Sequence, residues 1–285
     1  MISEEFMFTS GGIKPRILPA GWYPGGKEEI FRVFAGWEKK EPKNNKIKAI
    51  IAPHAGWYYS GEIAFQAFSY LDREIDTVVV AGGHLGKNDY PLVSRNKLFD
   101  ATIGNIDNNT ELMSYLSEKI DFHEDIYPDN TIEIQLPMLK YFLPESKIVW
   151  LRIPPNYDVV SAIAEAIHDY ASGNNKKIIV AGSTDLTHYG LNYGFQSHGS
   201  GAKGLQWVKN VNDKEFIDYI SDFKIAEAID HSCRNFSSCS SGAAGLAAKY
   251  AALSNAKEGR VVTYRTSYDI SPADSFVGYV SIIYY

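Results

Sequence analysis

The sequence predicts an α/β protein with a mostly parallel sheet and helices on both faces. Short apolar runs rich in Val and Ile alternate with helical patterns, an order that is typical of βαβ units. Most of these runs do not alternate apolar with polar residues, as expected for strands buried on both faces. The 285 residues contain no internal repeat, low-complexity tract or linker, so we expect one domain over residues 1–285.

The expected elements follow from apolar runs, periodicity and turn residues. Helical periodicity is clear in residues 61–71, where Ile63, Ala67 and Leu71 fall on one side. A long loop is expected over residues 189–204, which are rich in Gly, Ser, Asn and aromatics. The expected strands are residues 47–52, 77–81, 148–153, 178–181 and 277–283, the other helices are residues 159–170 and 243–253, and a small hairpin is expected in residues 88–100.

Composition and charge exclude several classes of protein. The chain is 45% hydrophobic and 22% charged, which is ordinary for a globular protein. Its net charge of -6, without a clustered basic face, argues against nucleic-acid binding. No apolar run is long enough to span a membrane. Residues 1–10 lack the basic start of a signal peptide, and the two cysteines imply no disulfide framework, so we expect a cytoplasmic location. Nothing in the sequence predicts the oligomeric state.

Polar side chains follow three of the expected strands. His54 comes after the strand at 47–52, His84 after the strand at 77–81, and Asp185 and His188 after the strand at 178–181. In open α/β sheets, sites form outside the carboxyl ends of the strands. If the strands are parallel, these four side chains lie at one edge of the sheet and face one pocket. The other histidines, expected in loops or on helices without a role in a site, are His123, His168, His198 and His231.

One of the two cysteines adds a candidate nucleophile or metal ligand. Cys239 precedes a helix of small residues, and Ser238 is a candidate N-cap for that helix. A thiol at a helix N-terminus has a lowered pKa. A free cysteine is equally well explained as a small buried hydrophobe, so both interpretations stay open. Cys233 is the alternative candidate for the cysteine of this pocket.

Several ordered motifs resemble the Memo family. They are PHAGWYYSG at 53–61, RILPAGWYP at 16–24, TIEIQLP at 131–137, STDLTHY at 183–189, and TS at 266–267 followed by FVGY at 276–279. Prokaryotic members are named AmmeMemoRadiSam system protein B. The resemblance covers nearly the whole chain and implies a LigB-like fold, similar to that of the class III extradiol dioxygenases. Those enzymes hold non-haem iron(II) with two histidines and a carboxylate, whereas Memo proteins have a cysteine in place of the carboxylate.

The resemblance implies roles for individual residues. His54, His84 and Cys239 are the implied metal ligands, with iron(II) expected first and copper or zinc as alternatives. Asp185 and His188 are the implied catalytic residues of the same pocket. The chain departs from the family pattern in three places: Gly83 precedes His84 where relatives often have Ser, Asn130 replaces a usual His, and Ser240 follows the cysteine where relatives usually have Gly.

Two function hypotheses from different classes remain. The first is a metal-dependent oxidoreductase, dioxygenase-like, acting on an unknown small molecule, because two histidines plus one further ligand leave positions open for O₂ chemistry. The second is a binding or adaptor module for a peptide or small ligand. In either case Trp22, Trp57 and Tyr58 would line the ligand cleft, although aromatic residues of this kind also pack in cores. A cysteine hydrolase that uses Cys239 and a nearby histidine is a third hypothesis.

Overall fold

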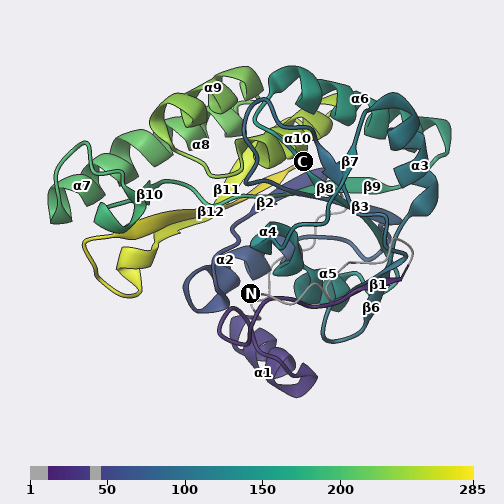
Figure 1. Cartoon of the computed structure of the whole chain (residues 1–285), viewed down its shortest axis with the longest axis horizontal. Coiled ribbons are helices and arrows are strands. Elements are labelled where there is room, and N and C mark those ends of the chain that lie inside the picture. Colours follow the sequence, from purple (N-terminus) through teal and green to yellow (C-terminus); the bar gives the residue numbers. More distant parts are fainter. Residues whose placement is uncertain (1–11, 39–45) are drawn as a thin grey trace.

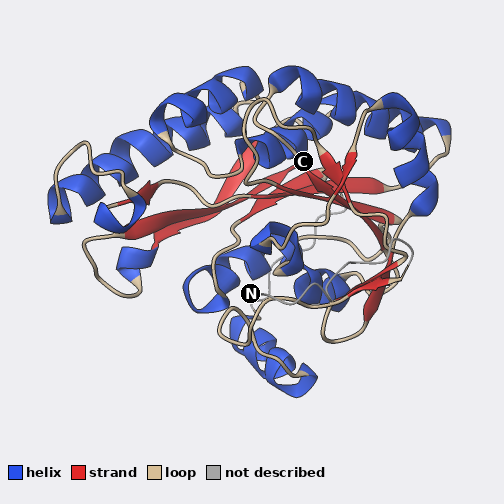
Figure 2. Cartoon of the chain, viewed as in Figure 1, coloured by secondary structure: helices blue, strands red, loops and turns tan. Residues whose placement is uncertain are grey.

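A mixed nine-stranded sheet forms the centre of the molecule (Figures 1 and 2). The computed structural model describes residues 12–38 and 46–285, so the prediction for residues 1–10 lies outside the described part. The strand order is β10-β12-β2-β9-β3-β8-β4-β7, and β11 pairs with β12. The strands are β2 (Ala49–Ala52), β3 (Thr77–Gly82), β4 (Leu92–Val93), β7 (His123–Glu124), β8 (Lys147–Arg152), β9 (Ile178–Ser183), β10 (His188–Tyr189), β11 (Gly259–Thr266) and β12 (Phe276–Tyr284).

The sheet is mixed rather than mostly parallel, so the α/β prediction is confirmed only in its coarser form. The central strands β2, β9, β3 and β8 are parallel to one another. Strand β12 runs antiparallel to β2, β10 and β11, and β4 runs antiparallel to β8. Every residue of β12 is buried. Because burial on both faces gives the same apolar composition in either direction, the sequence could not reveal that this strand is antiparallel.

Helices cover both faces of the sheet (Figure 2). Alternate strand residues contribute to two separate cores: Ile51 and Val79 pack with helices on one face, and Ile50 and Val80 with helices on the other. The first face carries α3 (Thr110–Lys119), α6 (Tyr157–Gly173), α8 (Asp213–Ser221), α9 (Ile225–Asn235) and α10 (Ser241–Leu253), and the second carries α1 (Lys27–Trp37), α2 (Trp57–Ser69), α4 (Asn130–Glu133) and α5 (Leu136–Phe142).

The hairpin expected within residues 88–100 is wrong. Strand β4 from this segment joins the large sheet, while β5 (Leu98–Asp100) pairs with β6 (Asn105–Asp107) and β1 (Ile13–Lys14) in a small separate sheet. The tight turn lies after β5 instead, where Thr102 and Gly104 both have positive φ.

The segment 189–204, expected as a long loop, is partly ordered. It includes the end of β10, the short helix η1 (Leu191–Tyr193) and the start of α7 (Gly201–Trp207). A π-helix, η2 (Val208–Asn212), joins α7 to α8, and a 3-10 helix, η3 (Ser267–Asp269), follows β11. Among the described residues, no helix is both long enough and apolar enough to cross a membrane.

Candidate metal centre

Two strand ends and one loop bring His54, His84 and Cys239 together. His54 lies two residues beyond β2 and His84 two residues beyond β3. Both strands pair in parallel with β9, so their carboxyl ends lie at the same edge of the sheet. The two imidazole centroids are 5.0 Å apart, with an interplanar angle of 86°. Cys239 reaches them from the segment between α9 and α10.

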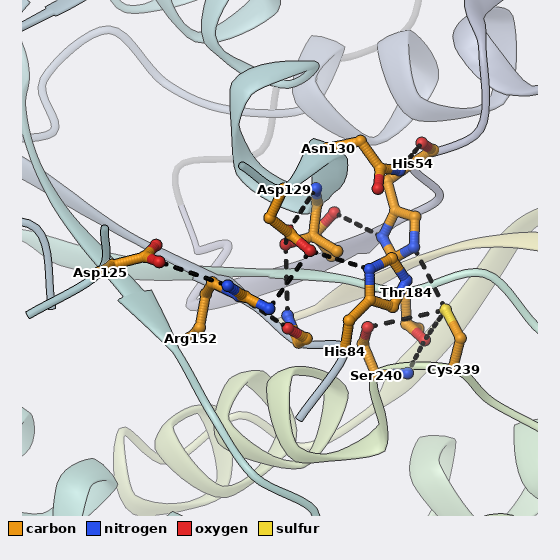
Figure 3. Close-up of polar contacts among 12 residues, drawn as sticks. His54, His84, Asp125, Asp129, Asn130, Arg152, Thr184, Cys239 and Ser240 are labelled. Atoms are coloured by element: carbon orange, nitrogen blue, oxygen red, sulfur yellow. Dashed lines mark hydrogen bonds and ion pairs between the residues drawn. The ribbon is translucent and has the colours of Figure 1, made fainter. Parts of the chain in front are cut away.

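These three residues can supply one ligand atom each to a common ion. Their ligand atoms all lie within 4.8 Å of one another. The sulfur of Cys239 is 3.2 Å from Nε2 of His54. Figure 3 shows the two side chains pointing toward each other. His54 is buried, Cys239 is half-buried and His84 is exposed, so solvent reaches the group at His84. Cys233, by contrast, is exposed on α9 and is not part of this group.

The ring of His54 is held so that Nε2 faces the sulfur. Its Nδ1 lies 3.2 Å from the hydroxyl of Ser183, and Gln135 Nε2 donates a hydrogen bond to the same hydroxyl. The backbone N–H of His54 donates to Asp185 at 2.7 Å, and Asn130 Nδ2 donates to the His54 carbonyl at 2.9 Å. Asn130 therefore supports the backbone of a candidate ligand residue.

Gly83 and Ser240 pack closely between the segments that carry His84 and Cys239. A Cβ added to Gly83 would lie 2.3 Å from the Cβ of Ser240, which is closer than real side chains come. A side chain at position 83 would therefore overlap both the side chain and the Cα of Ser240, so one of the two segments would have to shift.

The thiol of Cys239 lies just outside α10, not inside its first turn. The helix begins at Ser241 with Ser240 as N-cap, so the expectation that Ser238 caps it is wrong. The Ser238 hydroxyl is instead hydrogen-bonded to the Thr184 hydroxyl, and the Cys239 N–H donates to the Asp185 carbonyl at 3.2 Å. These contacts hold the segment before α10 against the residues that follow β9.

Charge coupling controls protonation in the group. Burial alone would raise the pKa of the Cys239 thiol, but the charge of His54 and hydrogen bonds from both imidazoles hold that pKa well below its usual value. Burial alone would lower the pKa of His84, but hydrogen bonds with Asp129 and Cys239 raise it to about 10. The pKa of His54 is also raised, against its burial, mainly by the charge of Cys239. These pKa shifts favour a thiolate at Cys239 beside an imidazolium at His84.

Asp185 and His188 lie beside this group, with His188 on the cavity wall. The carboxylate of Asp185 is buried, and burial raises its pKa. Its second oxygen is 4.0 Å from Nε2 of His188. The His188 ring stacks on Tyr193 at a centroid distance of 5.0 Å. The four polar residues predicted at strand ends are therefore neighbours at one edge of the sheet.

The site opens into a cavity of about 510 Å³. Of the three aromatic residues predicted to line a ligand cleft, only Trp22 lines it. Trp57 is 5% exposed and packs among Tyr23, Phe34 and Trp37, while Tyr58 points to solvent. Sequence reasoning did not identify most of the polar lining, which includes Tyr59, Asn192, Tyr193, Ser267, Ser271, Ser275 and Tyr279. Tyr59, Ser267 and Tyr279 stand within the family motifs, which was the available signal.

The remaining histidines lie outside the metal group. His231 is buried, with its ring nitrogens on Ser237 and Glu215 at 2.7 and 3.0 Å. His198 stacks on Trp207 with a centroid distance of 3.8 Å. These contacts fix the loop before Cys239 and the start of α7.

Comparison with known proteins points to one family. The family model described as Memo-like protein matches residues 18–283. Similar proteins include the MEMO1 family protein of Thermococcus onnurineus, 29% identical over 94% of this chain and 97% of that protein. The MEMO1 family protein of Pyrococcus abyssi is 28% identical over 92% of this chain and 96% of its own length. That of Methanosarcina mazei is 29% identical over 90% and 92%.

Proposed function

The chain belongs to the Memo family, and from that premise we propose that it is a non-haem metal protein with redox activity on a small molecule. The proposed ligands are His54, His84 and Cys239. The observation that carries the proposal is their geometry: two imidazole nitrogens and one thiol lie within 4.8 Å of one another. Both imidazoles line the cavity of about 510 Å³, and Cys239 lines a neighbouring cavity of about 340 Å³. We extend the proposal to the LigB-like fold and to a single domain.

The donor set fits a reactive metal ion rather than a structural one. No other His, Cys, Asp or Glu joins the group among the residues that the structure describes. A structural site usually closes the coordination sphere with four protein ligands, whereas three ligands leave positions open. A bound ion of this kind would supply Lewis-acid and redox chemistry. Iron(II) is the first candidate, and the soft thiolate keeps copper and zinc as alternatives.

The neighbouring side chains are suited to bind a ligand and to move a proton. His188 stands at the cavity wall, where its imidazole can donate or accept a proton at a bound ligand. Asp185 is close enough to bias the orientation of that ring. The hydroxyl and amide groups of the wall favour a small polar molecule over an apolar one.

The proposal is tested by measuring the number of metal ions per chain after equal anaerobic loading with iron, copper or zinc. Wild type and His188→Ala should hold close to one ion per chain, because His188 is not a proposed ligand. His54→Ala, His84→Ala and Cys239→Ser should hold much less, and Cys233→Ser is the matched control because the same change is made at an exposed cysteine. If all of these proteins bind the same small amount, the metal proposal fails.

A binding module is the second candidate function. A neighbouring cavity of about 430 Å³ is lined by Trp22, Tyr23, Trp37, Trp57 and Tyr58, an aromatic surface suited to a peptide or flat ligand. Metal-independent binding of a peptide library, lost in Tyr58→Ala but kept in Cys239→Ser, would favour this function. Turnover of an ester that is abolished by selective alkylation of Cys239 would favour the hydrolase instead.

A further inference from the structure

A series of buried charged groups leads across the sheet edge to the ring of His84 (Figure 3). The guanidinium of Arg152 lies between two carboxylates, 3.3 Å from Asp125 and 3.3 Å from Asp129. Asp129 in turn lies 2.9 Å from Nδ1 of His84. The side chains of Arg152 and Asp129 are each only 6% exposed. Burying a charged group costs free energy unless the group is paired and hydrogen-bonded, and each of these groups is.

The partners of Asp129 determine which nitrogen of His84 keeps its proton when the other nitrogen binds an ion. One carboxylate oxygen accepts hydrogen bonds from the backbone N–H and the hydroxyl of Thr131. The other oxygen faces Arg152 and Nδ1 of His84. An ionised carboxylate only accepts, so Nδ1 must be the donor. Nε2 then faces the Cys239 sulfur, on the side where the metal ion would bind.

Arg152 also holds the main chain that carries His84. Its Nε donates to the Gly83 carbonyl at 2.8 Å, while its two other nitrogens face Asp125 and Asp129. His84 itself has φ of +59°, a conformation that non-glycine residues rarely adopt without support. One planar guanidinium thus fixes both the backbone of His84 and the carboxylate partner of its ring. A lysine cannot make three divergent contacts of this kind.

We propose that Asp129 and Arg152 are positioning residues that keep the proton of metal-bound His84 on Nδ1 and present Nε2 to the metal. Ligating histidines generally depend on such partners for ring orientation and donor strength. The inference deepens the proposed function and rests on it. It adds two residues, far apart in sequence, whose effect on the ion acts through His84.

Two measurements on the full chain test the inference. The first loads ¹⁵N-histidine protein with ¹¹³Cd²⁺ and identifies the coordinating nitrogen of each imidazole by its coupling to cadmium. Coupling to Nε2 of His84, with a proton retained on Nδ1, is expected. The second measures Zn²⁺ affinity by chelator competition for wild type, Asp129→Asn, Arg152→Lys and Asp125→Asn. Loss of affinity by roughly 10–100-fold is expected for the first two variants.

The controls separate positioning from general stability. Asp125→Asn should weaken Zn²⁺ binding less, because Arg152 keeps its contacts to Asp129 and Gly83. Ile163→Val, in the core contacts of α6, should leave the affinity unchanged although it lowers stability. If Asp129→Asn does not fold, the ¹⁵N–¹¹³Cd coupling pattern of wild type and the Zn²⁺ affinity of Arg152→Lys still test the inference.

The outcomes distinguish this inference from the proposed function. If wild type binds none of Cd²⁺, Zn²⁺, copper and iron(II), the proposed function fails, and the inference fails with it as a statement about a metal ligand. If wild type binds metal but coordinates through Nδ1 of His84, the inference alone is overturned. Equal Zn²⁺ affinity in wild type, Asp129→Asn and Arg152→Lys would overturn it in the same way.

Discussion

Gly83 and Ser240 meet face to face between the two ligand segments. Ser240 fits here because Gly83 has no side chain. The Ser240 hydroxyl lies 3.6 Å from the Cys239 sulfur. Because the two residues are in direct contact, substitutions at these positions should be coupled energetically.

A substitution cycle tests this coupling. Gly83→Ser alone should lower both the thermal midpoint and the Zn²⁺ affinity, because the new Cβ overlaps Ser240. Ser240→Gly alone should have a smaller effect. The double variant should recover most of the loss, and additive losses in the double variant would show that the two residues do not compensate.

At the residue scale, the sequence predicted groups that follow strands and missed groups that meet across the fold. His54, His84 and His188 could be placed together because the strand-end rule needs only local sequence. Asp129 and Arg152 were missed because their contacts join distant segments. A charged residue at the end of the apolar run 148–153 was a usable signal for Arg152. Trp57 lines the neighbouring aromatic cavity rather than the one beside His54, because neighbouring residues on a helix point in different directions.

At the scale of elements, the π-helix η2 and helix α8 support the strand-end loop that carries His188. Asn212 donates to the hydroxyl of Thr187 at 2.9 Å, and Asp213 accepts from the Thr187 N–H at 3.1 Å. Asp213 also accepts from Tyr264 at 2.8 Å. Neither of these two helices was predicted from the sequence, and a π-turn leaves no clear periodic signal.

The buried carboxyl of Asp213 predicts a pH-dependent stability. Burial raises its pKa from 3.8 to about 7. The folded state therefore holds this proton more tightly than the unfolded state, and stability falls as the pH rises from about 4 to 7. Each pKa unit corresponds to about 1.4 kcal/mol, so the loss is on the order of a few kcal/mol.

Asp213→Asn should remove this dependence. An amide can still accept from Thr187 and can donate to the Tyr264 oxygen, without titrating. Denaturant unfolding at several pH values should show wild type losing stability relative to this variant between pH 4 and 7. Asp218→Asn is the matched control, since Asp218 is exposed on the same helix. Parallel pH profiles for wild type and Asp213→Asn would contradict the prediction.

At the scale of the whole molecule, the three proposed ligands come from widely separated parts of the chain. His54 and His84 follow strands in the first third, and Cys239 precedes a helix near the end. The unfolded chain cannot hold these groups in one place, so an ion that binds the folded site should stabilise the whole fold. The strand order that brings them together could not be predicted from the sequence, because pairing between distant strands leaves no local pattern.

Metal loading should therefore raise the unfolding midpoint of the entire chain. At a free Zn²⁺ concentration 100 times the Kd, linkage predicts about 2.7 kcal/mol of added stability. The gain should shrink as the pH falls, because protons compete for the imidazoles and the thiolate. Differential scanning calorimetry with and without Zn²⁺ measures the gain, and Cys233→Ser should match wild type while Cys239→Ser should lose most of it. An equal shift in both cysteine variants would mean that Zn²⁺ stabilises the protein somewhere other than at this site.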